Sequence, residues 1–127
     1  MRRLSAAALL ALAASCQSTG EPTALVVHDV YFDLNDASPE AVQELVDGCH
    51  DYLGELPGIA HFAAGARVAE REGPVNDLDF DVSLHVWFTD HASYESYDTD
   101  PQHLEFIETF RENWAGVRVF DSDVTGG

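Results

Sequence analysis

The stretch from Phe80 to Phe88 constrains the fold more than any other part of this 127-residue chain. Its apolar side chains alternate with polar or amphipathic ones, in the order Phe80, Asp81, Val82, Ser83, Leu84, His85, Val86, Trp87, Phe88. Alternation with a period of two predicts a β-strand that buries one face. A sheet of such strands needs a second layer over its apolar face. We therefore expect one domain in which helices cover one side of an antiparallel sheet.

A second well-defined element is the helix that begins at Pro101. Proline fits the first turn of a helix, and Asp100 before it is a natural N-cap. His103 precedes Phe106 and Ile107 by three and four residues, so we expect its imidazole on the inward face of the helix. Apolar residues at helical spacing predict that buried face, up to an expected end at Gly116: Phe106, Ile107, Phe110 and Trp114.

The remaining segments predict three more strands and a second helix. A strand from Leu25 to Leu34 carries His28 on its apolar side. Ser38 and Pro39 begin a helix that ends at Gly54. Its apolar stripe consists of Val42, Leu45, Val46, Cys49 and Leu53. The other predicted elements are strands over residues 59–69 and 117–124, and a short helix, capped by Asp90 and running through Tyr94 and Tyr97, that joins the helix at Pro101.

The elements follow one another as strand, helix, strand, strand, helix, strand. This order predicts a ferredoxin-like βαββαβ domain of the α+β class, with a four-stranded antiparallel sheet and both helices on one face. Tyr31, His85 and Trp87 then point to the other face, which we expect a second copy of the chain to cover. Asp29 and Asp81 with His85 could also be read as metal ligands, but a polar interior between two subunits is favoured.

The first 15 residues predict a secretory signal peptide. Arg2 and Arg3 precede an apolar run over residues 4–14 that is too short to span a bilayer. The run ends in Leu12-Ala13-Ala14-Ser15-Cys16, which resembles the signal of bacterial lipoproteins, whose cysteine is lipidated and becomes the N-terminus. Lipidation at Cys16 implies a protein anchored in the cell envelope and facing the periplasm. Because alanine is a weaker match than leucine at position 13, plain secretion stays open as an alternative.

Residues 16–23 are expected to form a polar tether, and residues 24–124 the domain. A lipidated Cys16 leaves Cys49 without an intrachain disulfide partner. Cys49 lies on the apolar side of its predicted helix, where the role of a small buried hydrophobe is favoured over that of a nucleophile.

The charge of the chain excludes two classes of partner. Lysine is absent, and 6 basic residues stand against 23 acidic ones, for a formal net charge of −17. Such a surface repels nucleic acid and anionic lipid headgroups. We therefore expect no nucleic-acid partner, and contact with a membrane only through the N-terminal lipid anchor. No residue pattern indicates a cofactor or a metal.

Four segments together resemble the stress-responsive dimeric α/β-barrel family, known as Dabb. They are His28-Asp29-Val30-Tyr31-Phe32-Asp33-Leu34, Leu56-Pro57-Gly58-Ile59, the apolar strand at residues 80–88, and Tyr97 with Asp100-Pro101-Gln102-His103. The resemblance extends over about residues 24–124. It implies that two ferredoxin-like chains pair sheet to sheet and form an eight-stranded barrel.

One branch of this family suggests a chemistry. It contains a plant polyketide cyclase that closes an aromatic ring by an aldol step, with a histidine matching His103 as base and a tyrosine matching Tyr97 in support. An imidazole can remove a proton next to a carbonyl near neutral pH, while a phenol can donate to the enolate oxygen. The resemblance implies a pocket between sheet and helices, for which we expect four further lining residues: His28, Val82, Phe106 and Tyr94.

Two departures, one from the cyclase and one from many members of the family, leave three functions open. Val82 stands where the cyclase has a further histidine, and Asp100 stands where many members of the family have histidine. The first function is a homodimer that binds a small apolar or aromatic molecule. The second is a cyclase-like or cofactor-free monooxygenase-like enzyme that uses His103 and Tyr97 as an acid–base pair. The third is a structural dimer module in which His28 and His103 only brace a helix against the sheet.

Overall fold

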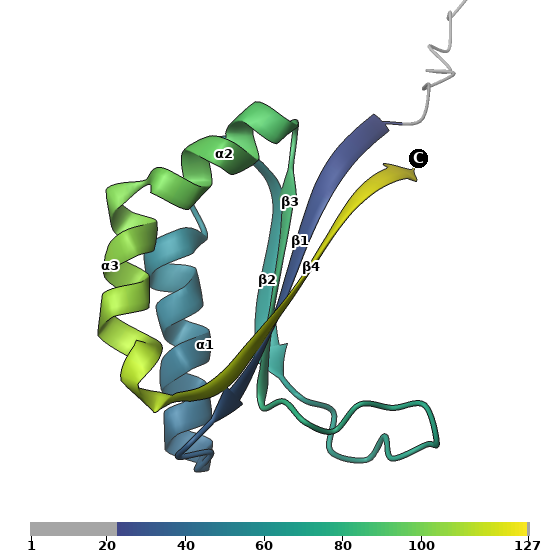
Figure 1. Ribbon diagram of the computed structural model, residues 1–127, viewed down its shortest axis with the longest axis vertical. Coiled ribbons are helices and arrows are strands. Elements are labelled where there is room, and N and C mark those ends of the chain that lie inside the picture. The colour runs from purple at the N-terminus through teal and green to yellow at the C-terminus, as the bar shows by residue number, and fades with distance from the viewer. Residues whose placement is uncertain (1–22, 127) are drawn as a thin grey trace, which may run out of the picture.

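The computed structural model describes residues 23–126 as two layers, a four-stranded antiparallel sheet and a layer of helices on one of its faces (Figure 1). The strands are β1 (Thr23–Leu34), β2 (Ile59–Ala66), β3 (Val82–Phe88) and β4 (Trp114–Gly126). The helices are α1 (Pro39–Leu53), α2 (His91–Thr99) and α3 (Pro101–Phe110), followed by the 3₁₀ turn η1 (Arg111–Asn113). The sheet order β2-β3-β1-β4 is the ferredoxin-like arrangement that the sequence predicts. The predicted signal peptide and Cys16 lie outside the described residues.

Each helix begins at the capping residue that the sequence predicts. The Ser38 hydroxyl accepts a hydrogen bond from the amide of the third residue after it, at 3.3 Å. The Asp90 carboxylate accepts one from the Ser93 amide at 2.7 Å, and the Asp100 carboxylate accepts one from the Gln102 amide at 2.8 Å. These caps satisfy backbone donors that the first turn of a helix leaves unpaired. They also fix where α2 ends and α3 begins, and so which side chains of both helices face the sheet.

The core lies between the two layers and includes the predicted stripe of α1. Cys49 is fully buried there, and within the described residues it forms no disulfide. Burial raises the pKa of its thiol from 9.0 to about 12, so the side chain stays neutral at physiological pH. The prediction that Cys49 is a small buried hydrophobe is confirmed. Its buried neighbours in the core include Val26, Val30, Phe32, Leu45, Leu53, Leu84, Val86 and Phe88.

We had expected Trp114 to lie in the helix that begins at Pro101, and Gly116 to end that helix. Both residues belong to β4 instead. The backbone leaves the helix at η1 because the Asn113 side chain bonds both the amide and the carbonyl of Asp36, at 2.8 and 2.9 Å. Trp114 then starts β4 opposite Leu34. Its ring still packs on the core, 5.0 Å from the ring of Phe32. The apolar spacing therefore predicted correctly that Trp114 packs against the core, where it is partly buried, but predicted its secondary structure wrongly.

Phe80 was also placed wrongly by the alternation. β3 begins only at Val82, because the Asp81 amide donates to the Phe32 carbonyl at 2.8 Å and the chain turns there. The ring of Phe80 instead packs edge-on against Tyr31, with a centroid distance of 5.0 Å, on the face away from the helices. β2 likewise ends at Ala66 rather than at residue 69. Residues 67–81 form a loop that projects from the sheet on the side opposite the helices (Figure 1).

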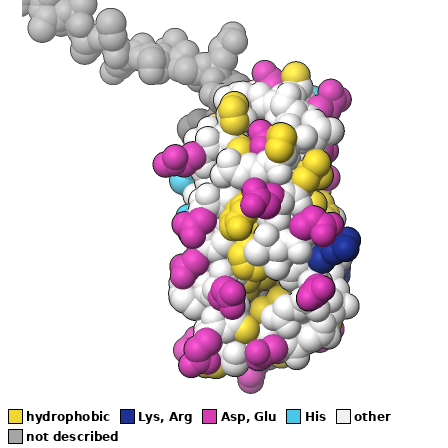
Figure 2. Space-filling view, turned by 90° about the vertical axis from the view of Figure 1, so that its left-hand side faces the viewer, with side chains coloured by type: hydrophobic (Ala, Val, Ile, Leu, Met, Phe, Trp, Pro, Cys, Tyr) yellow, Lys and Arg dark blue, Asp and Glu magenta, His cyan; other side chains and the backbone are white. Residues whose placement is uncertain are grey.

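The outer surface of the helix layer is acidic. Figure 2 shows Asp and Glu side chains around an apolar stripe on this face. Four of the carboxylates belong to α1 and line a shallow hollow beside Tyr52 and Phe110: Glu40, Glu44, Asp47 and Asp51. None of the described helices is long and apolar enough to cross a bilayer.

Candidate functional site

The candidate site is a cluster of polar and aromatic side chains where α2 lies against β1 and β4. Its centre is His28, whose side chain is only 8% exposed. The Nδ1–H of His28 donates to Oδ1 of Asp121 at 2.7 Å, because the two residues are direct partners in the β1–β4 register. From α2, the hydroxyl of Tyr94 donates to the same carboxylate at 3.0 Å and lies 2.8 Å from Nδ1 of His28. Three elements far apart in the sequence thus meet at one carboxylate.

This arrangement determines which atoms are available for chemistry. Since Asp121 holds the proton on Nδ1, the Nε2 atom of His28 is left as a hydrogen-bond acceptor or a base. Burial, and then the hydrogen bond and charge of Asp121, raise the pKa of Tyr94 well above its usual value. Tyr94 therefore remains a protonated donor at neutral pH.

Tyr97, one turn further along α2, is almost fully buried against His28. It is 2% exposed, and its ring meets the imidazole of His28 edge-on at 5.9 Å. Its hydroxyl is buried and has no hydrogen-bond partner among the described residues. A buried hydroxyl without a partner is uncommon because desolvation of the group is uncompensated. Burial is also the main reason why the pKa of Tyr97 is raised, so this group is a neutral donor.

His103 lies at the solvent side of Tyr97. The two rings stack with centroids 4.4 Å apart, and the imidazole is half-buried rather than fully inward. Its Nδ1–H donates to the carbonyl of Asp98 at 3.2 Å. His28 and His103 thus have separate hydrogen-bond partners, and the ring of Tyr97 contacts both imidazoles.

Val82 and Phe106 lie apart from this cluster. Val82 pairs with Phe32, four residues along β1 from His28, and the ring of Phe106 lies 6.4 Å from that of Phe32. Both are buried in the closed core, at 0% and 2% exposed. Of the six predicted site residues in the domain, the structure brings four together: His28, Tyr94, Tyr97 and His103.

Asp121 is the member of this cluster that sequence reasoning missed. It occurs in a predicted strand among other acidic residues, and nothing in its immediate neighbours distinguishes it. The sequence does hold one signal, the alternation of side chains between the two faces of a strand. It places Asp121 on the same face as His28 only when the last strand is paired with the first one in the observed register. That alignment depends on a bulge near Leu34, which the sequence does not reveal.

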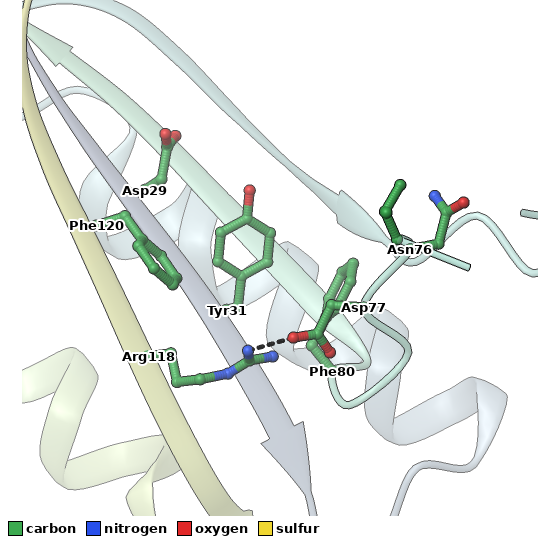
Figure 3. Close-up of a pocket in the computed structure, with 8 residues that line it drawn as sticks. Asp29, Tyr31, Asn76, Asp77, Phe80, Arg118 and Phe120 are labelled. Atoms are coloured by element: carbon green, nitrogen blue, oxygen red, sulfur yellow. Dashed lines mark hydrogen bonds and ion pairs between the residues drawn. The ribbon is translucent and has the colours of Figure 1, made fainter. Parts of the chain in front are cut away.

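The opposite face of the sheet carries a second group of side chains. His85 bonds Asp29 at 2.6 Å and Ser83 at 3.1 Å, which accounts for its polar atoms without a metal. Within residues 23–126 we find no group of three or more His, Cys, Asp or Glu side chains placed to hold a metal ion. Beside this pair is a hollow of about 540 Å³, lined by Tyr31, Phe80, Phe120 and other residues (Figure 3).

With this geometry in hand, comparison with known proteins identifies the family. The chain belongs to the Dabb family, because the model for the stress-responsive A/B barrel domain matches residues 26–124. The family resemblance seen in the sequence is thereby confirmed. No curated protein matches the chain by sequence.

Solved structures share the fold at low sequence identity. A Dabb family protein from Mesorhizobium loti is 21% identical with a TM-score of 0.67, over 81% of this chain and 99% of that one. A dimeric ferredoxin-like protein of unknown function from Thermobifida fusca is 16% identical with a TM-score of 0.67, over 80% and 92%. The hydroxynitrile lyase from Passiflora edulis is 19% identical with a TM-score of 0.65, over 81% and 95%.

Proposed function

We propose that this Dabb domain works as a homodimer that binds a small, neutral, largely apolar or aromatic molecule between the sheet and the helices. The observation that carries the proposal is the buried hydroxyl of Tyr97, which lacks a partner within the described residues. An acceptor atom of a ligand, such as a carbonyl oxygen, would satisfy this donor. The ligand would then lie among aromatic rings, as is usual in small-molecule sites.

The surroundings of Tyr97 support a neutral ligand over an anionic one. The negative charge of Asp98 acts on Tyr97, and the surface of the chain is strongly acidic. His103 stacks on Tyr97 from the solvent side, so its half-buried ring is the side chain that an entering ligand must displace. We therefore assign His103 to the entrance and His28 with Tyr94 to the inner wall.

The dimer is supported by the outer face of the sheet. The aromatic residues Tyr31, Trp87 and Phe120 gather on that face, which the helices do not cover, and Phe120 is 52% exposed. Similar folds are described as dimeric, as in the Thermobifida fusca protein. A second copy over this face would remove these rings from water.

Export and lipidation at Cys16 remain part of the proposal. Mass spectrometry of the protein purified from a bacterial host tests them. A mature chain that begins at a diacylated Cys16 supports the anchor, and an unmodified chain cleaved at another small residue supports plain secretion.

A second candidate function is acid–base catalysis centred on His28. The supporting observation is the contact of the Asp121 carboxylate with both His28 Nδ1 and the Tyr94 hydroxyl. A carboxylate that holds one ring nitrogen orients the other toward a substrate, as in hydrolase triads. One structure with this fold is a hydroxynitrile lyase. Ring stacking of His103 on Tyr97 supports their original assignment as an acid–base pair less well, because it aligns ring faces and not the polar atoms.

Thermal unfolding of the full chain tests the binding function. We would compare acetophenone, toluene and benzoate as an acceptor-bearing neutral, a plain apolar and an anionic ligand. We expect acetophenone to raise the midpoint most in the wild type, and Tyr97→Phe to abolish its advantage over toluene. Leu104→Ala, at an exposed site on α3, is the matched control. If none of the three compounds raises the midpoint and His103→Ala lowers it, the histidine is a brace and the domain is structural.

A further inference from the structure

The hollow on the outer face of the sheet has a wall built by the loop before β3. Figure 3 shows Tyr31 and Phe120 rising from the sheet, with the loop residues Asp77 and Phe80 beside them and Asn76 further along the loop. Its volume of about 540 Å³ is ample for a small molecule. None of its lining residues belongs to the candidate site on the helix side.

Arg118 of β4 fastens the loop to the sheet. Its guanidinium donates to the Asp77 carboxylate at 2.5 Å and to the carbonyl of Asp79 at 3.2 Å. Within the loop, the Asp77 carboxylate also accepts a hydrogen bond from the Asp79 amide at 2.8 Å. The amide of Gly73 donates to the Asn76 side chain at 3.0 Å. These bonds give the loop a defined shape and engage both terminal nitrogens of Arg118 with oxygen atoms of the loop.

Three aromatic rings form a corner inside the hollow. The rings of Tyr31 and Phe80 are 5.0 Å apart at 80°, and those of Tyr31 and Phe120 are 5.8 Å apart at 75°. Rings set nearly perpendicular to each other present both faces and edges to the space between them. The faces carry negative electrostatic potential, which attracts organic cations.

The charges around the hollow favour the same class of ligand. Arg118 is the one basic residue in its lining, and the carboxylates of Asp77, Asp79 and Asp33 all act on it. The carboxylate of Asp29 stands at the opposite end of the hollow, near the hydroxyl of Tyr31 (Figure 3). Negative charge thus exceeds positive charge around the aromatic corner, in a chain whose net charge is already −17.

We propose that this hollow binds a small organic cation, such as a quaternary or alkylated ammonium group, against Tyr31, Phe80 and Phe120. The inference goes beyond the proposed function, since it concerns the other face of the sheet. Binding does not require the proposed homodimer, in which the partner's sheet would close the open side of the hollow.

The test is an NMR titration of the full chain with three compact probes that differ in charge. Tetramethylammonium is the cation, tert-butanol its neutral counterpart and pivalate its anionic counterpart, and the ring signals of Tyr31 and Phe120 report binding. We expect saturable shifts with tetramethylammonium and affinity about fivefold weaker in Phe120→Leu, since one of three rings is lost. Asp29→Asn should also weaken the binding of tetramethylammonium, because it removes a carboxylate from the lining of the hollow. Leu104→Ala, on α3, should leave the affinity unchanged.

Three results would overturn the site. They are equal shifts with tert-butanol, an affinity that Phe120→Leu leaves unchanged, and no saturable shift because the partner subunit fills the hollow. The mass in solution, measured on the same samples, separates this inference from the dimer. A monomer that binds tetramethylammonium keeps the site and refutes the dimer, whereas a dimer that binds none of the probes refutes the site alone.

Discussion

Asp121 and His28 are direct partners across β4 and β1, and the carboxylate of Asp121 accepts the Nδ1–H of His28 at 2.7 Å. The first and last strands of the domain therefore orient the central imidazole together. Tyr94 joins them from α2 through the same carboxylate. The cluster thus forms only once the first and last strands of the domain have paired.

Asp121→Asn should lower the free energy of unfolding by about 1 kcal/mol, because the hydrogen bonds of His28 and Tyr94 lose their charged acceptor. Urea unfolding at pH 7 measures the change. Asp123→Asn is the control, since its pair with His91 is exposed on both sides and such pairs contribute little. Equal losses in the two variants would mean that the Asp121 cluster adds nothing beyond an ordinary surface pair.

Tyr97→Phe should leave the free energy of unfolding unchanged or raise it, because it deletes a buried hydroxyl without a protein partner. Tyr94→Phe should lower it by about 1 kcal/mol, because that hydroxyl donates to Asp121. Both substitutions remove the same atom from the same helix, so urea unfolding of the pair isolates the hydrogen bond. A comparable loss in Tyr97→Phe would show that its hydroxyl is satisfied by water, and would remove the main support for the ligand.

Gly58→Ala should lower the free energy of unfolding by about 2 kcal/mol, because φ at this position is +83°. An added Cβ would also lie 2.4 Å from the Cβ of Ser93, in the first turn of α2. Gly65→Ala in β2 is the control, because nothing lies within 4 Å of its Cβ position. Chemical denaturation measures the free energy of unfolding of both variants. A loss no greater in Gly58→Ala than in the control would show that the turn before β2 relaxes freely.

Alkaline pH should destabilise the domain partly through Cys49. Its thiol pKa of about 12 in the folded chain exceeds the value of 9.0 that it has when exposed, so the folded state holds this proton more tightly. The contribution is complete below pH 9 and is lost as the pH rises from 9 to about 12. The raised pKa values of Tyr94 and Tyr97 act in the same direction above pH 10.0.

Cys49→Ala removes the thiol share of this loss and leaves both tyrosines. We therefore expect its stability to fall less steeply than that of the wild type between pH 9 and 12, although its stability at pH 7 is lower by about 1 kcal/mol through the lost sulfur contacts. Denaturant midpoints measured at intervals of pH follow both curves. Parallel curves would show that the thiol does not titrate during unfolding.

Local chemistry in the sequence predicts most of this fold. Ser38, Asp90 and Asp100 cap helices where expected, because side-chain acceptors and the fixed φ of proline act within a few residues. Alternation in residues 82–88 predicts β3, because period two follows directly from strand geometry. The order of these elements then leaves few topologies, and the ferredoxin-like one is observed.

Prediction from the sequence fails where contacts between residues far apart in the chain determine the structure. Trp114 continues a helical spacing but lies in β4, because Asn113 bonds Asp36 across the domain and ends the helix. Asp121 reaches His28 only through the strand register, and the split of Val82 and Phe106 from the other site residues follows from distances along β1. Periodicity indicates which face a residue occupies, but not which of the residues on that face are neighbours.

The position of β4 in the sheet has a consequence for self-association. β4 is an edge strand of 13 residues, so one row of its backbone donors and acceptors has no strand beside it in the described chain. Such an edge invites pairing with another chain, and proteins guard against it with charged side chains. Asp121 and Asp123 place two carboxylates along it. We therefore expect the residue that orients the central imidazole also to oppose aggregation, so that neutralising it favours strand-to-strand assembly.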